Sequence, residues 1–264
     1  MMGWKTWRRR RLMQRPLPAA WLGVLIRNVP YYLKLSEAEQ RQLQGLIQVF
    51  LAEKRFEGCG GLEITDEIRV TVAAHACLLL LGREPAFYPG LYSILVYPHP
   101  FVSKVTKLQP DGTVWEGPQV RLGQSSPRGS VVLAWDAVLK DVTQFDDGRN
   151  VVLHEFAHQL DSQSGAMEGA PQLPKGSMYA AWAYVLGREY AALVADLSRH
   201  RATFLNPYGA TNPAEFFAVV TEYYFEKPLE LKERHPDLFE QLKLFYGHDP
   251  SRLNPKGNEP THGH

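Results

Sequence analysis

Residues 151–161 read VVLHEFAHQLD, and the interpretation of the rest of the chain starts from this stretch. It contains the pattern HExxH. On an α-helix, His154 and His158 lie four residues apart on one face, where both imidazoles can reach one metal ion, and Glu155 lies beside them as a potential base. This pattern is typical of zinc hydrolases.

The residues around the motif favour a buried helix. Capping residues stand just upstream, at Asp146, Asp147, Gly148 and Asn150, and apolar residues recur at helical spacing, at Val151, Val152, Leu153, Phe156, Ala157 and Leu160. Polar side chains are costly in an apolar wall unless a metal or hydrogen bonds satisfy them. We therefore favour metal ligation over the alternative, an exposed polar stripe on an ordinary amphipathic helix.

Asp161 extends the same helical face, three residues after His158. A carboxylate there could accept the second ring N–H of a ligating histidine and so fix the orientation of that ring. The alternative is a water-exposed residue at the end of the helix.

A zinc hydrolase needs a third protein ligand and leaves the fourth position to water. The metzincin pattern would place Gly at 161 and His at 164, but the sequence has Asp161 and Ser164, which excludes that class. The ligand must come from elsewhere. Gly and Pro residues follow the motif, then a helical pattern over 178–199, a turn, and a new helix that begins after Asn212.

Two carboxylates in that new helix compete as the third ligand. Asn212 is a good N-cap and Pro213 a good first helical residue, which places Glu215 in the first turn. Glu215 could instead complete a capping box with Asn212. Glu222 lies seven residues further on the same face, and spacing alone does not separate it from Glu215.

Two segments carry a resemblance to a known family. HEFAHQLD at 154–161 and YGATNPAEFFAVVTEYYFE at 208–226 resemble the Mlc titration factor A (MtfA) family of bacterial zinc-dependent peptidases, and 46–70, 94–102 and 129–138 match it as well. The similarity covers most of the chain. It implies a zinc site of two histidines and one glutamate, with Glu215 as the third ligand. Glu222 then supports a ligand from behind or serves in packing, and Tyr208 matches a tyrosine that the family has near the metal.

One position departs from that family. Some members carry a further histidine in the region equivalent to 113–116, where it can occupy the open metal position in a resting form. Here the aligned residue is Trp115, so we do not expect such a block, and His99 is too distant along the chain to replace it.

The motif and the resemblance together predict a zinc-dependent peptidase, and the resemblance implies aminopeptidase-like action on short peptides. Glu155 would take the proton of the attacking water, and Tyr208 would donate a hydrogen bond to the developing oxyanion. Without the resemblance, Tyr208 could simply pack beside Pro207. The alternatives are a protein that sequesters a partner, such as a transcriptional repressor of the Mlc type, and a zinc hydrolase of non-peptide substrates.

Composition sets the cellular context. Hydrophobic residues make up 45% of the chain, and 29 basic against 28 acidic residues give a net charge of +1, which does not indicate direct nucleic-acid binding. No stretch reaches membrane-spanning length, and the apolar run at 18–26 is too short for a secretion signal. Two cysteines do not make a disulfide framework, so we expect cytoplasmic residence.

The order of elements predicts an α+β fold with a zincin-like core, and the resemblance implies similarity to the catalytic domain of anthrax lethal factor. We expect an N-terminal segment at 1–34 and one peptidase domain at 35–250, helical to about 90 and catalytic from 91. A disordered tail at 251–264 would hold His262 and His264. Helices are predicted at 36–54 and 68–81, and strands at 92–97 and 131–135, the latter as the edge strand above the cleft. Asp111-Gly112 indicates a hairpin turn.

Overall fold

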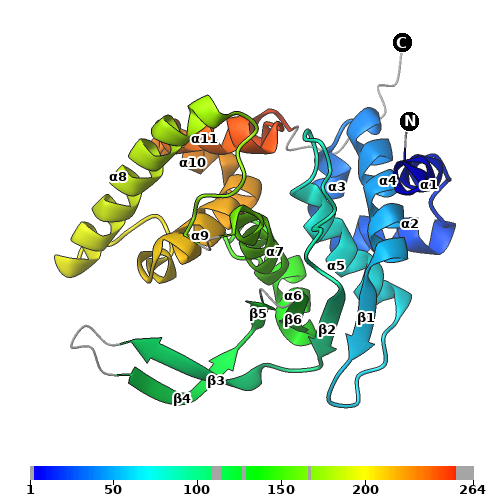
Figure 1. Ribbon diagram of the computed structural model, residues 1–264, viewed down its shortest axis with the longest axis horizontal. Helices are drawn as coiled ribbons and strands as arrows, with labels where there is room; N and C mark the ends of the chain where they lie inside the picture. The colour runs from blue at the N-terminus through cyan, green and yellow to red at the C-terminus, as the bar shows by residue number, and fades with distance from the viewer. Residues whose placement is uncertain (1–2, 109–113, 127–128, 166–167, 254–264) are drawn as a thin grey trace, which may run out of the picture.

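The computed structural model describes residues 3–108, 114–126, 129–165 and 168–253. Figure 1 shows a group of N-terminal helices on one side of a small sheet and a group of C-terminal helices on the other, with one helix, α7, between them. The fold is therefore mixed α+β and mostly helical, as the sequence predicts.

The elements follow the chain in this order. The N-terminal part contains α1 (Trp4–Met13), α2 (Ala19–Asn28), α3 (Pro30–Lys34), α4 (Glu37–Glu53), β1 (Arg55–Gly58) and α5 (Asp66–Leu78). The middle contains β2 (Ser93–Tyr97), β3 (Phe101–Leu108), β4 (Val114–Arg121), β5 (Gly123–Ser126), β6 (Ser130–Ala134), α6 (Trp135–Thr143) and α7 (Val151–Asp161). The C-terminal part contains α8 (Tyr179–Ser198), α9 (Pro213–Glu226), α10 (Pro228–Arg234) and α11 (Pro236–Tyr246).

The N-terminal helices form where local signals predict them. The predicted helix at 36–54 is α4, and its first turn is a complete capping box in which the side chains of Ser36 and Glu39 each bond the other's backbone N–H. The predicted helix at 68–81 is α5, which begins two residues earlier because the Thr65 hydroxyl caps it. Within α5, His75 is buried and its Nδ1 lies 2.9 Å from the carbonyl oxygen of Thr71, so this core histidine is satisfied locally.

The main sheet corrects one expectation. In the described part of the chain its strand order is β1-β2-β6-β5, with β1, β2 and β6 parallel and β5 antiparallel to β6. The segment 131–135 is therefore not the edge strand. Val131 and Leu133 are fully buried, as suits a central strand of a sheet with helices packed on it, whereas the polar residues Gln124 to Ser126 suit the edge.

Beside this sheet, β3 and β4 pair antiparallel with Phe101 opposite Arg121, as expected for a hairpin. In Figure 1 this ribbon extends away from the body of the molecule. The predicted turn at Asp111-Gly112 lies outside the described residues, as do the side chain of Trp115, the tail from 254 onward, and His262 and His264 within it.

Aromatic side chains hold α7 between the two helical groups. The ring of Phe156 lies 5.7 Å from that of Phe50 in α4 and 4.9 Å from that of Tyr88. On the other side, α7 contacts α9, where the ring of Phe217 lies 5.8 Å from that of Trp182 in α8. Because both groups bury apolar surface around α7, the position of the motif helix is set by the whole core.

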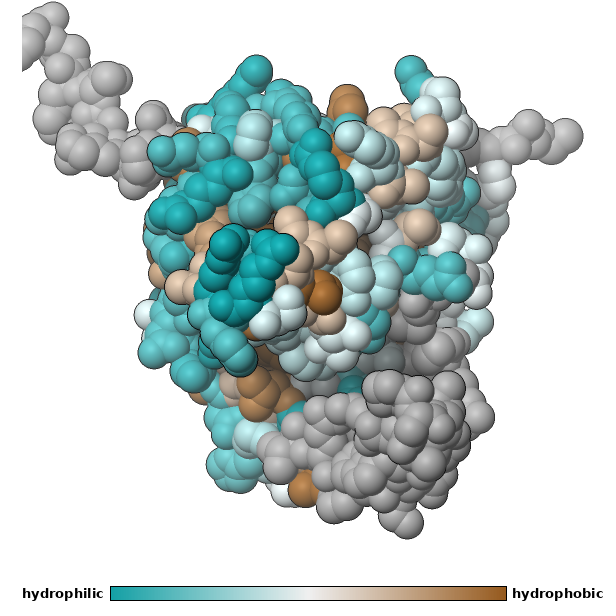
Figure 2. All heavy atoms as spheres, turned by 90° about the vertical axis from the view of Figure 1, so that its left-hand side faces the viewer, coloured by the Kyte–Doolittle hydropathy of each residue, from teal (hydrophilic) through white to brown (hydrophobic). Residues whose placement is uncertain are grey.

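The N-terminal segment shares this core, because Val24, Leu25 and Tyr31 are buried in the same cluster as α4 and α5. In the described part of the chain, no helix combines the length and apolarity needed to cross a membrane. The face formed by the C-terminal helices is mainly hydrophilic, with hydrophobic residues in small separate spots (Figure 2).

Candidate metal centre

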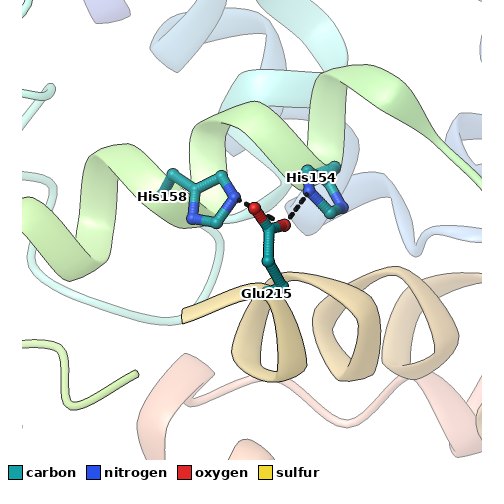
Figure 3. A group of neighbouring side chains, drawn as sticks. All are labelled: His154, His158 and Glu215. Atoms are coloured by element: carbon teal, nitrogen blue, oxygen red, sulfur yellow. Dashed lines mark hydrogen bonds and ion pairs between the residues drawn. The ribbon is translucent and has the colours of Figure 1, made fainter. Parts of the chain in front are cut away.

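The motif helix starts at a defined cap. The Asn150 side chain accepts a hydrogen bond from the N–H of Leu153 at 3.0 Å, which fixes the first turn of α7. His154 and His158 then lie one turn apart, with ring centroids 4.9 Å from each other, and both point toward α9 (Figure 3).

Glu215 meets the two histidines from the facing helix. Its backbone N–H donates to the Asn212 side chain at 3.0 Å, so Asn212 caps α9 as the sequence predicts. The carboxylate of Glu215, however, is turned to the histidines: Oε2 lies 2.9 Å from Nε2 of His154 and 3.2 Å from Nε2 of His158 (Figure 3). Burial alone would raise the pKa of Glu215, but the hydrogen bonds to the two histidines outweigh it and hold that pKa far below its ordinary value.

This donor set fits a zinc ion. The nitrogen and oxygen atoms offered by His154, His158 and Glu215 all lie within 4.8 Å of one another. Ligand atoms about 2.0 to 2.1 Å from a tetrahedral zinc are separated by roughly 3.3 Å, which matches the two contacts of the Glu215 oxygen. Two imidazole nitrogens and one carboxylate oxygen are the ligands of many catalytic zinc sites.

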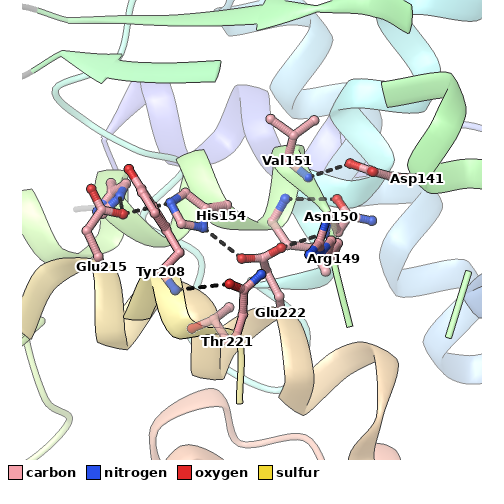
Figure 4. A network of polar contacts seen from close by, with 12 residues as sticks. Asp141, Arg149, Asn150, Val151, His154, Tyr208, Glu215, Thr221 and Glu222 are labelled. Carbon is pink, nitrogen blue, oxygen red and sulfur yellow. Dashed lines mark hydrogen bonds and ion pairs between the residues drawn. The ribbon is translucent and has the colours of Figure 1, made fainter. Parts of the chain in front are cut away.

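Glu222 lies on the other side of His154. Its Oε1 accepts from Nδ1 of His154 at 2.7 Å, and its Oε2 accepts from the backbone N–H of Asn150 at 2.6 Å (Figure 4). The spacing of residues in α9 left Glu215 and Glu222 equal, whereas the structure separates them: Glu215 faces the Nε2 atoms, and Glu222 orients one ring from behind. Burial lowers the pKa of His154, but the carboxylates of Glu222 and Glu215 raise it more, and the net pKa is well above its usual value.

Asp161 does not support a histidine ring, contrary to the expectation from its position. Its Oδ2 accepts from the backbone N–H of Gly169 at 2.8 Å, and the Gly169 carbonyl accepts from Nε1 of Trp182 at 3.0 Å. Among the described residues, the returning loop and not a histidine supplies the hydrogen-bond partner of Asp161. Asp161 therefore anchors the segment that leaves the motif helix.

Glu155 lies beside the histidines and packs against strand β5. It is 6% exposed, and a Cβ atom at Gly123 would stand 2.6 Å from its Oε1 and 2.7 Å from its Cγ. Burial raises the pKa of the Glu155 carboxyl. Gly123 is thus required for space at this point, a role that no local pattern in the sequence signals.

Tyr208 lies in the single-turn 3-10 helix Pro207–Ala210, which the Asn206 side chain caps. Its ring centroid is 5.9 Å from that of His154, and Figure 4 shows it beside Glu215. Burial and the charge of Glu215 raise the pKa of Tyr208 to about 12. The phenol is therefore a neutral hydrogen-bond donor near the three candidate ligands.

Two carboxylates that contact the start of α7, Asp141 of α6 and Glu226 of α9, were not predicted as site residues from the sequence. Asp141 accepts from the backbone N–H of Val151 at 2.7 Å, and Glu226 accepts from the N–H of Gly148 at 3.2 Å and from the Asn150 side chain at 3.1 Å. Burial raises the pKa of Asp141 to about 7 and that of Glu226 to about 9. For Glu226, the four-residue spacing from Glu222 could have indicated that both side chains lie on one face of the helix.

A groove of about 970 Å³ opens onto these side chains. Strand β5 forms one wall, through Gly123 and Ser125, and α9 with Tyr208 forms the opposite wall. The candidate ligands and Glu155 line its floor. This volume accommodates a short extended peptide.

Comparisons with known proteins agree with this site. Residues 4–247 match the family model described as glucose-regulated metallo-peptidase M90. An uncharacterized protein of Synechocystis is 44% identical over 94% of this chain and 90% of its own length. Mlc titration factor A of Pectobacterium atrosepticum is 35% identical over 84% of each chain, and that of Salmonella arizonae 32% identical over 96% of this chain and 99% of its own.

Proposed function

The chain belongs to the Mlc titration factor A family, the glucose-regulated metallo-peptidases M90, and from this premise we propose that it is a zinc-dependent peptidase with aminopeptidase-like action on short peptides. The observation that carries the proposal is the convergence of His154, His158 and Glu215, with Glu155 beside them on the floor of a peptide-sized groove.

In this proposal the metal ligands are His154, His158 and Glu215. A zinc ion held there would acidify a water molecule and polarise a substrate carbonyl. Glu222 keeps His154 oriented, because its carboxylate accepts the Nδ1 proton and leaves Nε2 directed toward Glu215.

Glu155 is the proposed general base and acid. It would accept a proton from the attacking water and deliver it to the leaving amine when the peptide bond breaks. Its buried position against Gly123 suits this role, because a raised pKa makes the carboxylate a stronger base toward the attacking water.

Tyr208 is the proposed donor to the substrate carbonyl oxygen. Its phenol stays protonated at neutral pH, since its pKa is about 12, and it lies on the wall of the groove next to Glu215. A hydrogen bond from this phenol would stabilise negative charge that develops in the transition state. Tyr208→Phe should accordingly lower kcat more than it changes KM.

The architecture supports a zincin-type core, for which we propose likeness to the catalytic domain of anthrax lethal factor. We also propose a catalytic unit at 35–250 with the segment 1–34 packed on it. The cysteines Cys59 and Cys77 are free thiols, in keeping with the proposed cytoplasmic location.

Two substitutions test this function. A chromogenic amino-acid anilide is hydrolysed by the zinc-loaded protein and a chelator stops the reaction, if the proposal holds. Glu155→Gln should lose activity and retain zinc by metal analysis, whereas Glu215→Ala should lose zinc. Hydrolysis by Glu155→Gln at the wild-type rate would reject the mechanism, and full zinc occupancy in Glu215→Ala would reject Glu215 as a ligand.

A second function deserves a test because relatives with 32–35% identity carry the name Mlc titration factor A. We propose that this chain also binds a transcriptional repressor of the Mlc type. The inactive Glu155→Gln variant should still capture the host's repressor in a pull-down. Capture without cleavage of any peptide library would favour partner binding as the main function. Cleavage confined to esters or other non-peptide compounds would favour a zinc hydrolase of non-peptide substrates.

A further inference from the structure

The groove contains the guanidinium of Arg121, which makes no hydrogen bond or ion pair with a residue that the structure describes. Three basic residues line it, and of these Lys140 and Arg149 are exposed while Arg121 is partly buried. Nε of Arg121 is buried without a hydrogen-bond partner, and the side chain makes no hydrogen bond or ion pair with any residue that the structure describes. A buried N–H without an acceptor is unfavourable unless a ligand supplies one.

Three carboxylates that line the groove already have partners. The carboxylate of Asp141 accepts from the N–H of Val151, that of Asp147 from the N–H of Arg149, and that of Asp136 contacts His99. Arg121 is therefore the groove cation that is partly buried and makes no hydrogen bond or ion pair with a described residue.

The backbone of β5 shows how a substrate would lie beside this cation. The carbonyl of Leu122 accepts from the N–H of Ala134 and so points to β6. Because backbone groups alternate in direction along an antiparallel strand, the N–H and C=O of Gly123 and Ser125 point away from β6, into the groove that these residues line. An extended peptide can pair with them by its main chain.

Alternate residues of β5 lie against successive turns of α7. Gly123 contacts Glu155, and the Ser125 hydroxyl accepts from the Gln159 side chain at 2.5 Å. Two strand residues, about 6.6 Å, thus correspond to one helical turn of about 5.4 Å to 6 Å. Arg121 is the last residue of β4, two residues before Gly123, with a bend at Leu122 between the two strands. Burial raises the pKa of Glu155 and of Tyr208, and the positive charge of Arg121, which reaches both side chains, lowers it in part.

Charge favours one direction for the peptide. Arg121 and the first residues of α7 line the groove, and the start of α7 is the positive end of its helix dipole. Beyond the other end of α7, Glu168 lines the groove. A short peptide is complementary when its carboxylate lies at Arg121 and its amine toward Glu168, and this direction also runs antiparallel to β5. The next residue of a peptide extends about 3.8 Å beyond the scissile bond, within reach of an arginine side chain.

We propose that Arg121 binds the carboxylate of a short peptide, one or two residues beyond the bond that is cleaved, and thereby selects substrates with a free C-terminus. This inference rests on the proposed peptidase function. The guanidinium would form paired charge-assisted hydrogen bonds, which arginine supplies and neutral residues do not.

The test compares dipeptides Xaa-Ala with the same dipeptides amidated at the C-terminus, and with amides that carry Glu in place of Ala. The wild-type protein should favour the free acid by about 10- to 100-fold in kcat/KM. In Arg121→Gln this ratio should fall toward one, and Arg121→Lys should restore part of it. Arg149→Gln removes an exposed guanidinium from the same groove and should keep the wild-type ratio.

Three outcomes overturn the proposal. An unchanged ratio in Arg121→Gln would show that no carboxylate is bound there, and an equal loss on acid and amide would place Arg121 at the scissile carbonyl. A preference for the Glu amide over the free acid would assign the site to an acidic side chain. Far-ultraviolet circular dichroism of each variant excludes misfolding as the cause.

A binding measurement separates this inference from the proposed activity. Calorimetry on the zinc-loaded Glu155→Gln variant should show tighter binding of the acid than of the amide, and the added substitution Arg121→Gln should remove the difference. If wild-type protein cleaves neither peptide but this difference is present, the peptidase function fails and the carboxylate site stands. If both peptides are cleaved at equal rates and bound equally, the peptidase function stands and the carboxylate site fails.

Discussion

His154 is held between two carboxylates, and this arrangement gives Glu222 a testable role. Nδ1 of His154 contacts Glu222 at 2.7 Å, and Nε2 contacts Glu215 at 2.9 Å. A carboxylate that accepts the distal N–H of a metal-bound imidazole fixes the ring and increases its basicity.

Glu222→Gln should therefore weaken zinc affinity without removing a ligand. The amide preserves the shape of the side chain but loses the charge, and loss of such a partner typically costs about 10- to 100-fold in metal affinity. Competition with a chromogenic chelator measures the change. An affinity equal to that of the wild type would mean that the contact does not act on the metal site.

Gly123 is predicted to keep room for the proposed base. In Gly123→Ala the new methyl group would stand 2.6 Å from Oε1 of Glu155, so the carboxylate must move. We expect kcat to fall at least about tenfold, as for a displaced catalytic group, while zinc stays bound.

Gly187→Ala is the matched control for this change. Gly187 lies in α8, and a Cβ atom there meets nothing within 4 Å. Alanine should be neutral or stabilise the helix by up to about 1 kcal/mol, with kcat unchanged. Equal kcat values in Gly123→Ala and Gly187→Ala would contradict the spatial role of Gly123.

At the scale of elements, α9 supplies the carboxylates that bind the start of α7. Glu222 and Glu226 lie one turn apart on α9, and together they accept from Gly148 and Asn150 just before α7 begins. The bond from Glu222 satisfies the backbone N–H of the N-cap Asn150, one of the groups that a helix leaves without partners, and the bonds from Glu226 hold Gly148 and the Asn150 side chain. The same helix thus carries a candidate ligand at its start and the anchor of the motif helix near its end.

This anchor predicts a pH dependence of stability. Burial raises the pKa of Glu226 from 4.5 to about 9 in the folded protein. Between these values the unfolded chain releases the proton while the folded protein retains it, so the free energy of unfolding falls as pH rises. The slope for one such group is at most about 1.4 kcal/mol per pH unit.

Glu226→Gln cannot ionise and should flatten this slope. Urea unfolding of the wild type and the variant, measured across the range from 4.5 to 9, gives the two slopes directly. Parallel slopes over the whole range would show that Glu226 titrates normally in the folded state.

At the scale of the molecule, the candidate metal site joins α7 to α9 on the floor of the groove. A ligand that binds the folded state stabilises it by about 4.1 kcal/mol when its free concentration is a thousand times its dissociation constant. Adding zinc to chelator-treated protein should therefore raise the melting temperature, and Glu215→Ala should abolish the increase. An increase of equal size in Glu215→Ala would indicate that zinc stabilises the protein elsewhere.

The N-terminal helices are predicted to unfold together with the rest. Leu25 in α2 is 0% exposed, whereas its neighbour Ile26 is 48% exposed. Leu25→Ala should cost about 2 to 5 kcal/mol and shift the whole urea transition, while Ile26→Ala should have little effect. A separate early transition in Leu25→Ala would instead support the segment 1–34 as an independent unit.

Patterns within single elements were readable from the sequence. The four-residue step between His154 and His158 is set by helix geometry alone, and the caps at Ser36, Asn150 and Asn212 act within three residues of themselves. The α+β class followed from the order of such patterns. These features depend on contacts between residues close in the chain, which is why they survive without knowledge of the fold.

The tertiary structure decided everything that depends on how two elements face each other. In the structure, Glu215 faces Nε2 of His154 and Glu222 faces its Nδ1. Asp161 accepts a hydrogen bond from a backbone amide, and β5 is an edge strand where 131–135 was predicted to be one. The tertiary structure also brought Gly123 against Glu155 and left Arg121 unpaired in the groove among the described residues. These partners lie 8 to about 70 residues apart in the sequence, and side-chain packing of the whole core, not local periodicity, sets the rotation and register that bring them together.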